Sequence, residues 1–270
     1  MDQIKKEIAE HYDINPKKEW DRLKKDHPFE FRITTRVMDR YIKPDDSILD
    51  IGGGPGRYSI HYARKGHSVT LFDLSKENVA FAKKMARNHH VKMKFEVGDA
   101  CDLSRFRDNS FDQVFLMGPL YHLLNLDDRK KAVSEAIRVL RPGGHLFASF
   151  ISIFGGMIFV MKNDPRLVFL PEDIPFYEHF FKNESFGGKG FTYAFFATKK
   201  DVFDLFSQYK NILSYVTFFG QEGILAPNEF EMLKTTKAAR EQFIEYSYRL
   251  CENSDYYHMS EHFMYVGKKD

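Results

Sequence analysis

An acidic residue and four glycines stand together where an apolar run of the chain ends. These residues are Asp50, Gly52, Gly53, Gly54 and Gly56. Glycine reaches backbone conformations that other residues avoid, and it lets a ligand approach the main chain closely. Residues 57–65 are compatible with a helix, whose first N–H groups would face the turn. The order strand, glycine turn, helix therefore predicts a cofactor site at this point.

The spacing of the glycines distinguishes two kinds of cofactor loop. A dinucleotide fingerprint, Gly-x-Gly-x-x-Gly, would need its third glycine at position 57, where the chain has Arg57. The pattern Asp-x-Gly-x-Gly-x-Gly fits residues 50–56 instead, and it resembles motif I of class I S-adenosylmethionine (SAM)-dependent methyltransferases. The resemblance implies that the glycines pass against the thioether of SAM and that Asp50 lies near its ammonium group. A glycine-rich turn without a ligand is the structural alternative.

Two further acids follow later apolar segments. Residues 68–72 end at Asp73, and residues 92–97 are followed closely by Asp99. The paired oxygens of a carboxylate suit the two hydroxyls of a ribose. The resemblance implies that Asp73 binds the ribose and that Asp99 receives the adenine amino group, although an isolated Asp73 would more often be a turn residue. Neighbouring candidates for cofactor contact are Tyr12, Leu74, Ala100 and Met117.

The loop after the apolar segment 111–117 carries the candidate catalytic groups, Tyr121 and His122. In the family this loop lies beside the transferring methyl group. His122 would act as a general base near neutral pH and Tyr121 would orient the acceptor, while a turn-capping role is the alternative for His122. Amino-methyltransferases of DNA bases commonly carry Asn/Asp-Pro-Pro-Tyr/Phe here, whereas this chain has Gly-Pro-Leu-Tyr at 118–121. The loop therefore disfavours a nucleobase acceptor and leaves N-, O- or S-methylation of a small molecule open.

The remaining elements predict how these residues are positioned. Segment 138–144, Arg-Val-Leu-Arg-Pro-Gly-Gly, ends an apolar-periodic helix at 132–140 and is among the most specific signatures of the family. Later strands are expected at 145–150, 212–219 and 262–266, and further helices at 75–87 and 199–209. We predict an α/β fold: a Rossmann-like, seven-stranded, mostly parallel sheet with helices on both faces and an inserted aromatic-rich cap.

The chain divides into four predicted parts. They are an N-terminal helical arm or lid at 1–44, a SAM-binding core at 45–151, a cap over the acceptor site at 152–197, and the rest of the core at 198–270 with an inserted helix at 228–253. The inserted helix is expected to pack through Phe230, Leu233, Phe243, Tyr246 and Leu250. The resemblance is strong over 45–151, weak over 198–220 and 260–267, and slight elsewhere.

The predicted cap is unusually aromatic. Residues 151–197 hold twelve Phe and Tyr among 47 residues, against 16% aromatic residues in the whole chain, and their charges nearly balance. Gly187, Gly188 and Gly190 suggest a hinge or turn. An aromatic, near-neutral lid favours an apolar or aromatic small molecule as the acceptor. The alternative is that these aromatic side chains form the core of the cap itself.

Composition and charge limit the partners and the cellular location that we expect for this protein. The net charge is +2, and residues 1–46 contain 11 basic and 11 acidic residues, so we do not expect nucleic acid as a partner. Two widely separated cysteines predict neither a disulfide framework nor a metal site, which favours a cytoplasmic protein. The uncharged stretch 146–161 is shorter than a membrane span of about 20 residues, so no membrane is expected. We expect a monomer or a homodimer.

The favoured hypothesis is a SAM-dependent methyltransferase that acts on a small molecule and releases S-adenosylhomocysteine. A methyltransferase of RNA or protein would show a basic surface beside the methyl site. A non-catalytic SAM-binding protein would bind the cofactor without methyl transfer. A nicotinamide-dependent oxidoreductase is disfavoured by Arg57 at the position of the third glycine.

Overall fold

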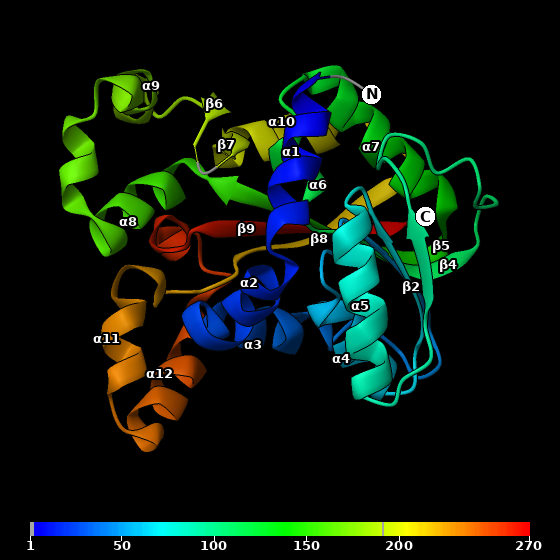
Figure 1. Ribbon diagram of the computed structural model, residues 1–270. Helices are drawn as coiled ribbons and strands as arrows, with labels where there is room; N and C mark the ends of the chain where they lie inside the picture. Colours follow the sequence, from blue (N-terminus) through cyan, green and yellow to red (C-terminus); the bar gives the residue numbers. More distant parts are fainter. Residues whose placement is uncertain (1–2, 191) are drawn as a thin grey trace.

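Nine strands form one central sheet in the computed structural model, which describes residues 3–190 and 192–270 (Figure 1). The strands are β1 (Ser47–Ile51), β2 (Ser68–Asp73), β3 (Lys94–Val97), β4 (Phe111–Leu116), β5 (Leu140–Ser152), β6 (Phe186–Lys189), β7 (Tyr193–Ala197), β8 (Leu213–Gly220) and β9 (His262–Lys269). The helices before β5 are α1 (Gln3–Ile14), α2 (Pro16–Asp21), α3 (Pro28–Met38), α4 (Arg57–Arg64), α5 (Lys76–Asn88), α6 (Pro119–His122) and α7 (Leu126–Val139). Those after β5 are α8 (Ile153–Asn163), α9 (Ile174–Lys182), α10 (Lys199–Ser207), α11 (Glu229–Lys234) and α12 (Lys237–Leu250).

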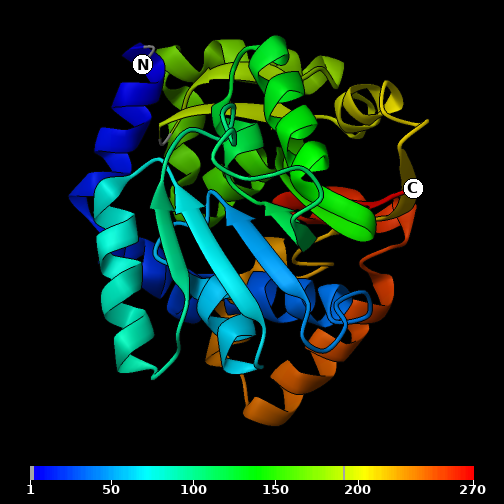
Figure 2. The same cartoon turned by 90° about the vertical axis from the view of Figure 1, so that its right-hand side faces the viewer.

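The strand order brings the ends of distant segments to one edge of the sheet. Strands β3, β2, β1, β4 and β5 are neighbours in that order and run parallel. Strand β9 runs antiparallel to β5, and β8 runs antiparallel to β9. The last residues of the parallel strands and of β8 therefore lie at the same edge as the first residue of β9. Figure 2 shows β1, β2 and β3 pointing toward this edge. The predicted fold class is confirmed.

The number of strands differs from the prediction of seven. The two additional strands, β6 and β7, form an antiparallel hairpin within residues 152–197. Ile151 of β5 is in register with both Phe196 of β7 and His262 of β9, so the hairpin lies on the opposite side of β5 from β9. Strand β5 continues beyond the end of β4, and this exposed edge gives the hairpin its backbone partners.

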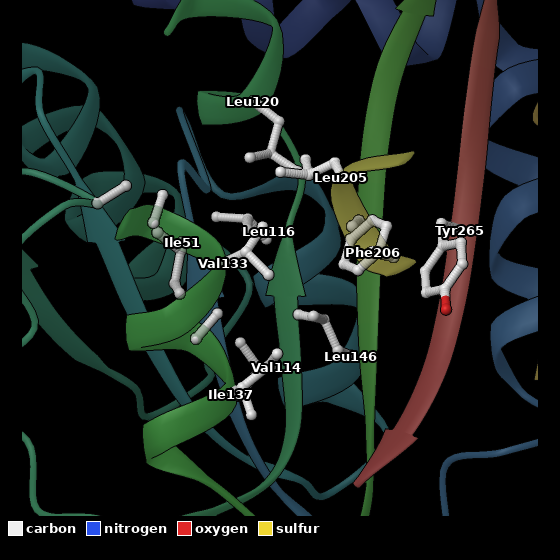
Figure 3. Close-up of a cluster of buried hydrophobic side chains, with 14 of the residues drawn as sticks. Ile51, Val114, Leu116, Leu120, Val133, Ile137, Leu146, Leu205, Phe206 and Tyr265 are labelled. Atoms are coloured by element: carbon white, nitrogen blue, oxygen red, sulfur yellow. The ribbon is translucent and has the colours of Figure 1, made fainter. Parts of the chain in front are cut away.

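Alternation along the strands divides the core between the two faces of the sheet. Leu49 and Ile51 of β1 point to one face, where α7 and α10 pack with side chains such as Phe206 (Figure 3). Ile48 points to the other face, where it belongs to one cluster with Ile33 of α3, Tyr62 of α4 and Ile244 of α12. Because both faces are covered, nearly all residues of β1, β2 and β4 are buried, as expected for an α/β sheet.

The segment 228–253 forms two helices, so the prediction of one helix is wrong. Thr236 begins α12, and its side chain accepts a hydrogen bond from the Ala239 N–H, which favours a new helix start over continuation of α11. The expected packing stripe is also wrong in part. Phe243 and Tyr246 are 39% and 47% exposed, whereas Ile244 and Ser247 are the buried residues of α12.

Residues 152–197 pack around a core of their own. Ile153 of α8, Phe176 of α9 and Phe196 of β7 belong to one buried cluster with Ile151 of β5. The uncharged stretch 146–161 consists of the end of β5 and most of α8. In the described part of the chain, no helix is both long and apolar enough to cross a membrane.

Candidate active site

A pocket opens where the glycine turn, the ends of β2 and β3 and the loop after β4 meet. Helix α1 lies across this edge of the sheet, beside α5 (Figures 1 and 2). Asp13 at the end of α1 accepts hydrogen bonds from the Ser75 hydroxyl (2.5 Å) and the Glu77 N–H (3.2 Å), which hold the arm against the first turn of α5. Most predicted site residues line this pocket: Tyr12, Gly52, Gly53, Gly54, Asp73, Leu74, Asp99, Ala100, Met117, Tyr121 and His122.

The turn requires glycine, both because of its backbone conformation and because neighbouring atoms leave no room for a side chain. Gly52 and Gly54 have φ angles of 74° and 53°, in the left-handed region. A Cβ atom on Gly52 would stand 2.4 Å from Cδ of Pro119, so the loop after β4 packs directly on the turn. Any side chain at Gly52 would force these two segments apart.

Asp73 joins the turn to the end of β2. One carboxylate oxygen accepts the Gly54 N–H (2.7 Å) and the other accepts the Ser75 N–H (2.8 Å). Burial raises the pKa of Asp73 although both hydrogen bonds act to lower it. Beside it, Oδ1 of Asn78 is buried and has no hydrogen-bond partner among the described residues. Each carboxylate oxygen keeps acceptor capacity, so this corner of the pocket suits a ligand that donates hydrogen bonds.

Asp99 is paired with a residue of the arm. Nζ of Lys5 lies 2.9 Å from one Asp99 oxygen, and the Cys101 N–H donates to the other at 2.9 Å. Burial by itself would raise the pKa of Asp99, but these two donors hold it below its usual value. Lys5 thus closes the pocket at the end of β3, and no sequence motif indicates this contact.

Asp50 and Gly56 lie beneath the turn and outside the pocket lining, which differs from the expectation that Asp50 faces a ligand. Asp50 is buried, and it accepts a hydrogen bond from the Ser59 hydroxyl of α4 (2.6 Å). Burial raises the pKa of Asp50 to about 7. A Cβ atom on Gly53 would lie 2.9 Å from the Asp50 carboxylate, so Asp50 supports the turn from below.

His122 is held by hydrogen bonds at both ring nitrogens. Its Nδ1–H donates to the carbonyl oxygen of Tyr193 (2.9 Å), and its Nε2 accepts from the Tyr12 hydroxyl (2.7 Å). Because a carbonyl can only accept, this pair of contacts identifies the Nδ1–H form. Burial lowers the pKa of His122 to about 4, so the ring is neutral at physiological pH.

Sequence reasoning missed the polar groups at the other end of the pocket. They come from the arm and from three strand ends: Glu19, Arg22, Glu30, Ser149, Gln221 and His262. Ser149 donates to Oε1 of Gln221 (2.5 Å), whose amide donates to Thr34 (3.2 Å). These residues occur in no local motif. The antiparallel insertion of β9 beside β5 is what places His262 at this edge.

Charges in this end of the pocket are paired. Arg22 donates to Glu30 at 2.8 Å, and the His262 Nδ1–H donates to Glu222 at 2.6 Å, with Glu30 at 3.9 Å. Burial by itself would lower the pKa of His262, but Glu222 and Glu30 outweigh it and raise the value to about 9. Arg22, Glu30 and His262, together with Glu19, therefore form a charged wall at this end of the pocket.

A second ionic cluster includes Glu261, which precedes His262 in the chain. Nζ of Lys162 in α8 contacts Glu229 (2.9 Å) and Glu261 (2.6 Å), and Nδ1 of His27 contacts Glu229 (2.8 Å). Lys162 supplies the positive charge that these clustered carboxylates need, so we assign no metal there. The cluster ties the arm, the cap and the last strand together.

The cap contributes to the pocket differently from the expectation. Among the described residues of 152–197, none lines the pocket. Phe176, Tyr177 and Phe196 are buried in the cap's own cluster, with Phe154, Phe180 and Phe186 packed against it. The arm and the strand ends supply the polar groups of the pocket instead. Of the aromatic residues in the arm, Tyr12 reaches the pocket, whereas Trp20 packs against Ile60 and under Arg57.

The sequences of known proteins resemble part of this chain. A methyltransferase domain model matches residues 48–144, which include both the glycine turn and the signature at 138–144. A demethylmenaquinone methyltransferase of Renibacterium salmoninarum is 35% identical over 109 residues, which cover 40% of this chain and 43% of that protein. The 27-O-demethylrifamycin SV methyltransferase of Amycolatopsis mediterranei is 36% identical over 121 residues, which cover 42% and 43%. The chain thus matches less than half the length of these relatives.

The likeness in three dimensions extends further along the chain. A solved SAM-dependent methyltransferase from Methanosarcina mazei aligns with a TM-score of 0.57 and 22% identity. The alignment covers 86% of this chain and 96% of that one. At this identity the comparison shows a shared fold.

Proposed function

We propose that this chain, whose residues 48–144 are a class I SAM-dependent methyltransferase domain, transfers a methyl group to an N, O or S atom of a small molecule. One observation carries the proposal. The glycine turn, Asp73 and Asp99 are separated in sequence, yet all three line the pocket that also contains Tyr121 and the charged wall. A cofactor end and an acceptor end thus meet in one cavity.

The residues of the cofactor end fit SAM. Asp73, with the unpartnered Oδ1 of Asn78 beside it, would receive the ribose hydroxyls, and Asp99 would receive the adenine amino group next to Lys5. Gly52 and Gly54 would leave room for the methionine part. When bound, SAM supplies a methyl group on a positively charged sulfur. The chain's own contribution is to orient the acceptor and to exclude water, which can account for about 7–11 kcal/mol of a barrier.

The acceptor end favours a small molecule that combines a ring with polar groups. Tyr12 and Tyr121 offer aromatic faces, while Arg22 and Glu30 offer charged ones. A wholly apolar acceptor would strip water from Arg22 and Glu30 without replacing its hydrogen bonds, which is unfavourable. The proposed acceptor is therefore less apolar than the composition of the cap suggests. The names of two relatives, which refer to menaquinone and rifamycin precursors, agree with ring-containing acceptors.

Calorimetric titration with SAM and with S-adenosylhomocysteine tests the cofactor site first. Binding of both is expected, and no binding by the folded protein at millimolar ligand would refute the proposal. Release of S-adenosylhomocysteine in the presence of a library of small phenols, thiols and amines then tests the activity. Cofactor binding without turnover of any compound would favour a binding protein, and turnover with RNA or protein alone would favour the macromolecular alternative.

Replacing His122 by alanine should lower turnover more than SAM affinity. The substitution removes the hydrogen bond to the Tyr12 hydroxyl and the one to the Tyr193 carbonyl, so Tyr12 and the loop beside Tyr121 lose their orientation. The measurement is the turnover number together with the SAM dissociation constant. Equal losses in both would show that His122 supports the pocket as a whole.

A further inference from the structure

We propose that His262 is the general base of the methyl transfer, and that the acceptor is a hydroxyl or amino compound that keeps a proton on its nucleophilic atom. This inference rests on the proposed function and specifies its chemistry. It reassigns the proton-accepting role from the loop after β4, where the sequence suggests it, to the first residue of β9. Five features of the pocket carry it.

The first feature is the orientation of the ring. Glu222 holds His262 twice, because one carboxylate oxygen accepts the Nδ1–H (2.6 Å) and the other accepts the backbone N–H (3.1 Å). Both carboxylate contacts come from a buried side chain, so the imidazole has a defined direction. A carboxylate that accepts the Nδ1–H leaves the Nε2 lone pair of the neutral ring for another partner.

The second feature is that no described residue engages Nε2 of His262, so the neutral ring offers this lone pair to a ligand. His262 lines the pocket, and its Nε2 has no hydrogen-bond partner among the described residues. His122, in contrast, uses Nδ1 for Tyr193 and Nε2 for Tyr12. A base must reach the proton that it removes within hydrogen-bonding distance. Of these two pocket histidines, His262 is the one whose second ring nitrogen is left for a ligand.

The third feature is its place beside the expected methyl position. Pro119 packs directly on Gly52 of the cofactor turn, and Tyr121 follows in the same short helix, α6. The ring centroids of Tyr121 and His262 are 6.4 Å apart. An acceptor that contacts Tyr121 on the side of His262 would therefore have the imidazole within reach.

The fourth feature is the balance of the step. The acceptor's heteroatom forms the new bond to the methyl carbon, and the electron pair of the breaking carbon–sulfur bond stays with sulfur. Nε2 of His262 accepts the proton that the heteroatom loses, and Glu222 stabilises the resulting imidazolium. The proton later returns to solvent. No oxidant, reductant or further reactant is needed.

The fifth feature is the charge of the wall. With His262 protonated, Arg22 and His262 face Glu19, Glu30 and Glu222, so one negative charge remains. This surplus disfavours a carboxylate or phosphate acceptor and tolerates a neutral hydroxyl or an amine. The charged groups that act on the imidazole are Glu222, Glu30 and Arg22, and the ring of Tyr121 lies beside it. Glu261 acts on it indirectly, because its charge affects Glu222.

The same charges predict the direction of the pH dependence. The carboxylates raise the pKa of His262 to about 9, so the neutral, proton-accepting form increases as pH rises toward that value. A plot of turnover against pH should therefore show a rising limb that reflects the deprotonation of His262. A positively charged sulfur nearby would lower this pKa and move the limb toward neutrality.

The activity test uses the library compound that the full-length wild-type protein methylates. His262→Gln should lower turnover by about 100- to 10,000-fold, which is the usual range for a general base, while the SAM dissociation constant stays nearly unchanged. Glu222→Gln should move the rising limb of the pH profile to lower pH, which loss of a structural contact would not do. His258→Gln is the matched control, because this exposed histidine lies outside the pocket. An unchanged pH profile in His262→Gln would overturn the proposal.

A second measurement needs no acceptor. Nitrogen-15 spectra of the histidine side chains, recorded with S-adenosylhomocysteine bound, report the protonation of each ring nitrogen. We expect His262 to titrate, to carry its proton on Nδ1 in the neutral form, and to titrate at lower pH in Glu222→Gln. A neutral ring with its proton on Nε2 would refute this inference alone, whereas absence of cofactor binding by the wild-type protein would refute the proposed function.

Discussion

Replacing Lys162 by methionine is expected to lower the free energy of unfolding by about 3–5 kcal/mol, because the change removes one partner of a buried ionic cluster. The Lys162 side chain is 2% exposed, and its ammonium group lies between Glu229 and Glu261. Methionine keeps most of the aliphatic chain but leaves two carboxylates without their main cation. Urea denaturation followed by circular dichroism measures the effect.

Two comparisons separate this effect from a general loss of a lysine. Lys200→Met removes a solvent-exposed pair with Asp204 and should change stability by less than about 1 kcal/mol. Adding Glu261→Gln to Lys162→Met should recover part of the loss, since one unpaired carboxylate disappears. A Lys162→Met protein as stable as wild type would show that the cluster does not hold the arm, the cap and β9 together.

Asp73→Ala should weaken SAM binding by about 1–3 kcal/mol, or roughly 5- to 150-fold. The variant loses the proposed acceptor of the ribose hydroxyls. It also releases the Gly54 and Ser75 N–H groups, which Asp73 now holds at 2.7 and 2.8 Å. Calorimetric titration gives the dissociation constant, and a thermal melt of the same sample reports whether the fold survives.

Asp102→Ala is the matched control for Asp73→Ala. Asp102 is an exposed aspartate in the loop that follows Asp99, and it lies outside the pocket lining. Its replacement should leave SAM affinity unchanged. If Asp73→Ala bound SAM as tightly as wild type, Asp73 would be a structural residue of the turn and the ribose role would be refuted.

The sequence by itself determined the features of this protein that depend on local patterns, namely the parallel strands and the residues at their ends. Asp73 ends one strand and Asp99 stands two residues after the next, and the glycines at 52–56 occupy positions with backbone and packing demands that few other residues meet. Because parallel strands end at one edge of a sheet, recognising the strands also places these residues together. The α/β class and the proposed cofactor end of the pocket follow from such short-range rules.

Only the tertiary structure decided the proposed acceptor end of the pocket. Arg22 and Glu30 belong to the arm, Ser149 to β5 and His262 to β9, and no spacing along the chain relates them. They meet because β9 inserts antiparallel beside β5 and because α1 to α3 fold back over the strand ends. The aromatic residues of 152–197 show the converse. Their composition suggests a substrate lid, whereas Phe176, Tyr177 and Phe196 pack into a cluster of the cap itself.

The physical reason is the range of the interactions involved. A turn conformation or a strand period depends on adjacent residues, so the chain records it locally. A buried group of charges depends on which distant segments pack together and exclude water, and the sequence does not record this locally. An aromatic residue is buried whether it covers a ligand or a neighbouring helix, so its presence does not show which of the two it contacts. The environment of His262, paired with Glu222 on one side and open to the pocket on the other, exists only once β8 and β9 are side by side.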